Sequence, residues 1–201
     1  MRLEIGNWAI RGLRRQDAPA LVKYANNRKI STQLRDRFPF PYTEKDAMAW
    51  LQRVSQEDPE VSFGIASPLE LIGGIGLELQ EDIYRRSAEI GYWLGEPYWG
   101  KGIATLAVGA LTDWAFAELG LVRVFATVFE SNPASARVLD KVGYSCEGRL
   151  RQSITKEGQT FDSFLYAAIR PPNLNRRSDS AARGSPDLDR FSRCLPKEEA
   201  E

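Results

Sequence analysis

The stretch from Gly91 to Thr105 constrains the fold more than any other part of the sequence, because a strand-like run passes through a glycine-rich turn directly into a helix. Gly100 and Gly102 have no Cβ, so their backbone can approach an anion closely. The unpaired N–H groups at the start of the following helix point toward the same place. The stretch therefore predicts a phosphate-binding turn that is built from main-chain amides and needs no metal.

Two other phosphate-binding motifs come close to parts of the sequence. Gly95 to Gly102 reads G-x-x-x-x-G-K-G, but Gly102 stands where a nucleotide P-loop needs the Ser or Thr hydroxyl that binds Mg²⁺. Gly73, Gly74 and Gly76 lack the third glycine of a dinucleotide-binding fingerprint, and the residues after them continue as an alternating strand. We therefore favour neither a P-loop nor a dinucleotide site.

The composition fits one globular domain with a sizeable core and excludes several classes of function. The chain has 201 residues, 43% of them hydrophobic, with 27 basic and 27 acidic side chains. This balance gives no overall positive field for nucleic acid. The sequence contains no histidine, so it cannot supply an imidazole base, a Ser-His-Asp triad or a His-containing zinc site. We expect no nucleic-acid partner and no metal.

Cysteine usage and hydropathy indicate the compartment. Cys146 and Cys194 are far apart, and Cys194 lies in a polar segment, which favours reduced thiols over a disulfide framework. Residues 1–10 lack the apolar core of a signal peptide, and no apolar run reaches membrane-spanning length. We expect a soluble, cytoplasmic protein without a membrane partner.

Hydrophobic periodicity and turn signals predict a mixed α/β domain in which three consecutive strands form an antiparallel meander. The expected elements in chain order are strand 8–13, helices 18–26, 28–35 and 44–54, strands 61–66, 70–80 and 86–94, a helix from Gly102 to Gly120, strand 122–129, helix 132–143, and strands 144–150 and 161–169.

Beyond Pro172 the sequence becomes polar. This segment carries six basic and six acidic residues and few apolar ones, so it cannot bury enough surface to order itself. We expect a solvated extension without a catalytic role. Leu188, Phe191 and Leu195 fall at helical spacing and leave a short docking helix open as the alternative.

Several motifs in a fixed order resemble the GNAT acyltransferase superfamily and, within it, ribosomal-protein N-terminal acetyltransferases of the RimJ/RimL type. The motifs are Ala88 to Leu94, Tyr98 to Thr105, Asn132 to Ser135, Val142 to Tyr144, and Glu147 to Leu150 with Asp162. The resemblance implies a GNAT domain over residues 1–170, and the polar composition beyond it predicts a disordered tail over 171–201. It also implies a mixed, mostly antiparallel sheet with helices on both faces, splayed between the fourth and fifth strands counted from residue 8.

The resemblance further implies that the glycine-rich turn binds the pyrophosphate of coenzyme A, while pantetheine lies in the splay like an extra strand. Trp99 replaces the Gln or Arg with which the superfamily phosphate motif usually begins, as is often found in this branch. A main-chain donor of the splayed strand would polarise the acetyl carbonyl. The residues expected to bind acetyl-CoA are Tyr92, Trp93, Leu94, Trp99, Gly100, Lys101, Gly102, Ile103, Ala104, Thr105, Asn132 and Ser135.

Glu89 is the expected general base. Without histidine, only a carboxylate or a chain of waters can take the proton of the amine, and a glutamate within an apolar strand is costly unless it is paired or functional. Arg85 or Arg86 could instead be its ion-pair partner. Asp162 matches an acidic position of the family and could receive the ammonium of the substrate.

Ser135 is the expected acid toward the departing thiolate. Leu139 stands where related acetyltransferases carry the tyrosine that protonates sulfur, and Ser135 is the nearest substitute. Asn132 could contact coenzyme A, but Asn followed by Pro is also an ordinary helix start. Tyr144 reads better as a core aromatic than as a catalytic residue, and Cys146 has no role in direct transfer.

Together these features predict an acetyl-CoA-dependent N-acetyltransferase that acts without a covalent enzyme intermediate. By resemblance, a protein N-terminal α-amine is the first choice of acceptor, and a polyamine or antibiotic amine is the second. A non-catalytic module that binds acetyl-CoA would share the same turn and stays open, whereas a Mg²⁺-dependent nucleotide enzyme is disfavoured. Monomer and homodimer are both compatible with the sequence.

Overall fold

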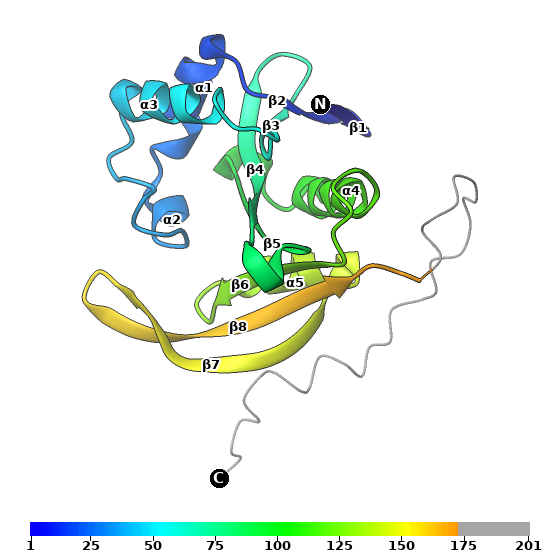
Figure 1. Cartoon of the computed structure of the whole chain (residues 1–201). Helices are drawn as coiled ribbons and strands as arrows, with labels where there is room; N and C mark the ends of the chain where they lie inside the picture. The colour runs from blue at the N-terminus through cyan, green and yellow to red at the C-terminus, as the bar shows by residue number, and fades with distance from the viewer. Residues whose placement is uncertain (173–201) are drawn as a thin grey trace.

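The computed structural model describes residues 1–172 (Figure 1). Eight strands and five α-helices make up this part of the chain, with short 3-10 turns at Arg15–Asp17, Asp82–Tyr84 and Glu96–Tyr98. The elements are β1 (Arg2–Ile5), β2 (Trp8–Gly12), α1 (Ala18–Ala25), α2 (Arg28–Ser31), α3 (Glu44–Val54), β3 (Ser62–Ala66), β4 (Leu71–Leu79), β5 (Ser87–Leu94), α4 (Ile103–Glu118), β6 (Arg123–Phe129), α5 (Pro133–Val142), β7 (Ser145–Lys156) and β8 (Gln159–Ile169).

The strands form one sheet in the order β1-β2-β3-β4-β5-β6-β8-β7. All neighbours are antiparallel except β5 and β6, which run parallel. The predicted meander is β3-β4-β5. β1 was not expected from the sequence. Gly6, with φ +74°, turns this strand back onto β2.

The parallel junction between β5 and β6 is short. Its register pairs Ser87, Ala88 and Glu89 of β5 with Arg123, Val124 and Phe125 of β6, and it goes no further. Beyond Glu89 the two strands separate, while each remains paired to its other neighbour. We call the space between them the slot. The predicted splay is therefore confirmed, and it lies between the fifth and sixth strands only because β1 precedes the strand that was counted first.

Helices cover both faces of the sheet, as expected (Figure 1). On one face α1 and α3 enclose an apolar cluster that includes Leu21, Leu51 and Leu71. On the other face α4 packs with Val108 and Leu111 against Ile90 and the main core. Successive residues of β5 therefore alternate between the α4 side and the α1/α3 side.

The β7–β8 hairpin reaches across to the α2 region (Figure 1). Lys156, at the end of β7, donates 2.8 Å to the carbonyl of Leu34 and 2.7 Å to Asp36. At the tip of the hairpin Glu157 pairs with Arg28 at 2.8 Å. The tip of the hairpin is thus held against α2 and the segment that follows it.

The expectations about the two cysteines and the polar tail have different outcomes. Cys146 is disulfide-bonded in the structure, so the expectation of a reduced thiol there is wrong; separation in sequence does not exclude a disulfide, because pairing depends on distance in the fold. Cys194, the rest of the predicted polar tail and its possible docking helix lie outside the described residues. Within residues 1–172, no helix is both long and apolar enough to cross a membrane.

Candidate active site

The glycine-rich turn leads into α4 with its amides exposed. Gly100 and Gly102 have φ +73° and +76°, a left-handed conformation that favours glycine. Gly102 is the N-cap residue, and no side chain caps the helix. Leu106 donates 3.1 Å to the Gly102 carbonyl, so the N–H groups of the preceding helical residues, Ile103 to Thr105, are left to face outward. A Cβ added at either glycine would meet no atom within 4 Å, which shows that space for a ligand lies beside them.

Trp99 fixes this turn to the end of β5. Its indole N–H donates to the Leu94 carbonyl at 2.6 Å, while the residue as a whole stays 44% exposed. Lys101 is exposed, and its ammonium lies over the Tyr98 ring at 5.4 Å. The hydroxyl of Tyr98 is 3.3 Å from that of Tyr24, which ties the turn to α1.

The main chain of β5 offers hydrogen-bonding groups to the slot. The Gly95 N–H bonds to the Ile72 carbonyl of β4 at 2.8 Å, and the direction of main-chain groups alternates along a strand. The groups of Leu94, Tyr92 and Ile90 therefore face the slot. Of these, Leu94 and Tyr92 were expected from the sequence and Ile90 was not. The main-chain groups of Trp93, which was also expected to contact coenzyme A, face β4 by the same alternation.

The side chain of Tyr92 crosses to α5 on the α4 side of the sheet. Its hydroxyl is 2.8 Å from Ser135 Oγ and 3.3 Å from the Ser135 carbonyl. Burial raises the pKa of Tyr92 to about 12, although the contact with Ser135 acts in the opposite direction. Asn132 accepts from the Ser135 N–H at 3.1 Å, so the structure shows the helix-capping role of this side chain.

Glu89 lies on the opposite face of β5 and is ion-paired to Arg35, not to Arg85 or Arg86. Arg85 and Arg86 instead donate to main-chain carbonyls. Arg35 comes from the loop after α2 and also pairs with Glu78, the cross-strand neighbour of Glu89, at 2.9 Å.

Burial alone would raise the pKa of Glu78, but the hydrogen bonds and charges of Arg37 and Arg35 outweigh it and hold this pKa below its usual value. A helix over 28–35 was expected, but α2 ends at Ser31, so Arg35 lies beyond it. Neither arginine was expected to pair with these carboxylates.

Open space adjoins Glu89. Gly91, two residues further along the same face, is exposed, and a Cβ added to it would meet no atom within 4 Å. Trp93 borders this space on the other side and packs edge-on against Phe38, with ring centroids 5.7 Å apart. A substrate group could therefore reach the slot at Gly91, next to the Glu89 carboxylate.

The sequence model of the Acetyltransferase (GNAT) domain matches residues 8–145, more than half of the chain. The chain belongs to the GNAT acetyltransferase family. Members of this family transfer an acetyl group from acetyl-CoA to an amine. The expectation of an acetyl-CoA-dependent N-acetyltransferase is therefore confirmed, without the identity of the acceptor. The expected fold is confirmed as well.

Three related proteins show the range of the family around this chain. The uncharacterized N-acetyltransferase YoaA of Bacillus subtilis is 37% identical over 58% of this chain and 66% of its own length. The ribosomal-protein-serine acetyltransferase of Escherichia coli is 38% identical over 53% of this chain and 59% of its own. A crystal structure of spermidine N-acetyltransferase from Vibrio cholerae, with CoA and spermine, shares the fold with TM-score 0.69 and 23% identity, covering 81% of this chain and 95% of that one.

Three other residues considered from the sequence lie outside the GNAT slot or are engaged elsewhere. Asp162 accepts 2.7 Å from the Gln152 N–H, which lowers its pKa, and pairs with Arg149. Tyr144 is buried, with its hydroxyl 2.6 Å from Thr112, as a core aromatic should be. Glu147 is ion-paired to Arg123. Among residues 1–172, no cluster of Cys, Asp and Glu could hold a metal ion.

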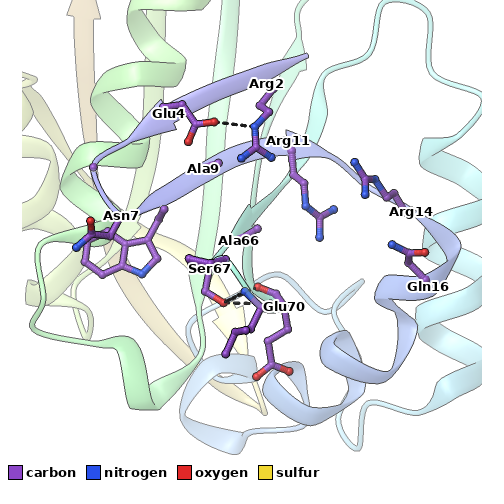
Figure 2. Close-up of a pocket in the computed structure, with 14 residues that line it drawn as sticks. Arg2, Glu4, Asn7, Ala9, Arg11, Arg14, Gln16, Ala66, Ser67 and Glu70 are labelled. Carbon is purple, nitrogen blue, oxygen red and sulfur yellow. Dashed lines mark hydrogen bonds and ion pairs between the residues drawn. The ribbon is translucent and has the colours of Figure 1, made fainter.

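A separate surface pocket of about 470 Å³ lies among β1, β2 and the β3–β4 connection, which do not border the slot (Figure 2). Its charged walls are largely compensated within the chain. Arg2 pairs with Glu4 at 2.7 Å, Glu70 pairs with Lys23 at 2.7 Å, and Arg11 is bound through two hydrogen bonds by Asp17. We therefore place the GNAT chemistry at the slot and not in this pocket.

Proposed function

We propose that this GNAT protein transfers the acetyl group of acetyl-CoA directly to a primary amine, and that the amine is the α-amino group of a protein N-terminus. The observation that carries the proposal is the end of β5–β6 pairing at Glu89, next to the open space over Gly91. An acyl chain in the slot and an amine arriving over Gly91 would meet there.

The residues of the slot fit coenzyme A without a metal. The outward-facing amides from Ile103 to Thr105 and the positive end of α4 suit a diphosphate. The slot-facing main-chain groups of Ile90, Tyr92 and Leu94 suit the amides of pantetheine, except that the Leu94 carbonyl is already used by Trp99. A bound acetyl thioester would supply the electrophilic carbonyl carbon.

In direct transfer, the amine nitrogen forms the new bond to the acetyl carbon, and the carbon–sulfur bond breaks with its electron pair leaving on sulfur. The amine must first lose a proton, for which Glu89 or a water beside it is the acceptor. A slot-facing N–H of β5 would polarise the carbonyl. Ser135, on the other side of the slot, would donate a hydrogen bond to the departing sulfur, which then takes up a proton. Glu89 would thus act on the amine and Ser135 on the leaving sulfur, from opposite faces of β5.

The charges near Gly91 support an acceptor with a single ammonium group. Glu89 and Glu78 are matched by Arg35 and Arg37, and Asp36 on the same side is matched by Lys156. A polyamine carries several positive charges and would be attracted by unmatched carboxylates. The chain also has a relative named for ribosomal-protein-serine acetylation.

The test is a comparison of acceptors with the purified full chain. A library of peptides with free N-termini, the same peptides with blocked N-termini, spermidine and an aminoglycoside would be incubated with acetyl-CoA, with CoA release and mass spectrometry as readouts. We expect acetylation of free peptide N-termini and none of the blocked peptides. Higher kcat/KM for either small amine would move the assignment to small molecules, and tight CoA binding without any product would favour a non-catalytic module.

A further inference from the structure

The hydrogen bond between Tyr92 and Ser135 is the one polar side-chain link described between β5 beyond Glu89 and α5, on the far side of the slot. It joins residues 43 positions apart in the sequence. The link lies where β5 and β6 have already separated, so it is part of the wall behind the slot. A simple packing role would not require a hydroxyl at this point, because Tyr92 already packs its ring against the main core.

The protonation of the two hydroxyls decides what the link can do. Burial raises the pKa of Tyr92 to about 12, so its hydroxyl keeps its proton at physiological pH and can act as a donor. Ser135 Oγ, at 2.8 Å, is nearer to it than the Ser135 carbonyl, at 3.3 Å. A serine hydroxyl that accepts a hydrogen bond still has its own hydrogen to donate. With Tyr92 as donor, that hydrogen is free to point into the slot.

We propose that Tyr92 is a positioning residue for the leaving group: by donating to Ser135 Oγ, it turns the Ser135 hydroxyl hydrogen toward the sulfur of coenzyme A. The inference rests on the proposed function. It assigns the tyrosine a role through its side chain, beyond the main-chain contact expected from the sequence.

The role is one of hydrogen bonding and leaves the phenol proton in place. A thiol has an ordinary pKa of about 8.5, well below that of this phenol, so the phenol would not give its proton to the sulfur. As the carbon–sulfur bond breaks, the electron pair stays on sulfur and the Ser135 hydroxyl donates to it. Donation from Tyr92 strengthens this hydrogen bond, because linked hydrogen bonds polarise one another. The released thiolate then takes its proton from solvent.

The variants for the test are Tyr92→Phe, Ser135→Ala and the double variant. Tyr144→Phe is the matched control, because it also removes a buried phenol hydroxyl that is hydrogen-bonded to a side-chain hydroxyl, that of Thr112 at 2.6 Å. Thermal unfolding of all four would separate loss of fold from loss of function.

The first readout is kinetic. We expect Tyr92→Phe to lower kcat about tenfold, with the KM for acetyl-CoA changed less than about twofold, while Tyr144→Phe keeps the wild-type kcat. Because Tyr92 acts through Ser135, the double variant should be no slower than Ser135→Ala. Losses that add in the double variant, or a Tyr92→Phe enzyme as fast as the wild type, would overturn the proposal.

The second readout needs no turnover. The ultraviolet absorbance of the thiolate reports the pKa of the CoA thiol bound to each variant. We expect the wild type and Tyr144→Phe to lower this pKa by about one unit, and Tyr92→Phe and Ser135→Ala to lose the shift. An unshifted thiol in the wild type would refute the role of Tyr92 even in an active enzyme. Absence of turnover with every amine, despite the expected shift, would instead count against the proposed function alone.

Discussion

Replacing Gly102 by alanine tests the phosphate-binding turn, and the fold supplies a matched control. Gly102 has φ +76°, and Gly120, at the other end of α4, has φ +65°. In both places an added Cβ would meet no atom within 4 Å. The two substitutions therefore impose the same kind of backbone strain without a clash. With 1.5 Å of rise per residue, the two sites are about 27 Å apart along the helix, so only Gly102 lies near the slot.

The expected magnitudes differ for stability and for ligand affinity. A non-glycine residue in the left-handed region costs about 1–2 kcal/mol, so both variants should melt about 2–8 °C lower than the wild type. At Gly102 the added methyl also occupies the space proposed for the diphosphate. Loss of one hydrogen bond to a charged group costs about 1.5–3 kcal/mol, which raises the Kd for CoA about ten- to a hundredfold.

The assay is isothermal titration calorimetry with CoA, with thermal unfolding of the same samples. Gly102→Ala should lose affinity, and Gly120→Ala should bind CoA like the wild type while losing a similar amount of stability. If Gly102→Ala binds CoA as tightly as Gly120→Ala, the diphosphate does not lie on the amides of this turn and the reasoning fails.

Three further predictions concern other parts of the molecule. Glu89→Gln should keep CoA affinity and lower kcat/KM about a hundredfold or more near neutral pH. Activity should partly recover as pH rises, because the amine then deprotonates by itself. An equal loss of activity at every pH would show that Glu89 is not the base. Arg11→Ala should destabilise the fold by about 3 kcal/mol in urea unfolding, because it leaves the 6%-exposed Asp17 carboxylate without its ion-pair partner and with only the Arg14 N–H to bind it. Arg2→Ala, on an exposed pair, should cost less than about 1 kcal/mol. Burial raises the pKa of Tyr92 from about 10 to about 12, so its contribution to stability is full below pH 10 and is lost as pH rises toward 12. Between pH 10 and pH 12, Tyr92→Phe should therefore lose less unfolding free energy than the wild type. An identical loss in both proteins would contradict the raised pKa.

Local patterns in the sequence were sufficient to predict the glycine-rich turn and the strand before it, whereas the slot was expected only from the family resemblance. Gly102 followed by an apolar helical period marks the start of α4, and the alternation of β5 places Glu89, Gly91 and Trp93 on one face. Such features depend on residues a few positions apart, whose spacing is set by the geometry of one strand or helix. They could be identified before the fold was known.

Links between distant elements could not be predicted in this way. The ion pair of Glu89 with Arg35 joins positions 54 apart, and Arg35 lies beyond the end of α2, where the sequence had predicted that the helix would continue. The sequence analysis therefore offered the neighbouring arginines instead. The same limit hid β1, whose assignment depends on pairing with β2 and not on its own residues. The helix-capping role of Asn132 was seen only in its 3.1 Å bond to the Ser135 N–H, and its contact with coenzyme A stays a prediction.

The short junction of β5 with β6 has a consequence for the protein as a whole. Only the stretch from Ser87 to Glu89 joins these two strands, and the main chain beyond it is left for another molecule to complete. A compound that fills this gap adds its binding free energy to that of folding. The concentration of the acyl donor would therefore affect the resistance of the enzyme to unfolding and proteolysis, as well as its rate.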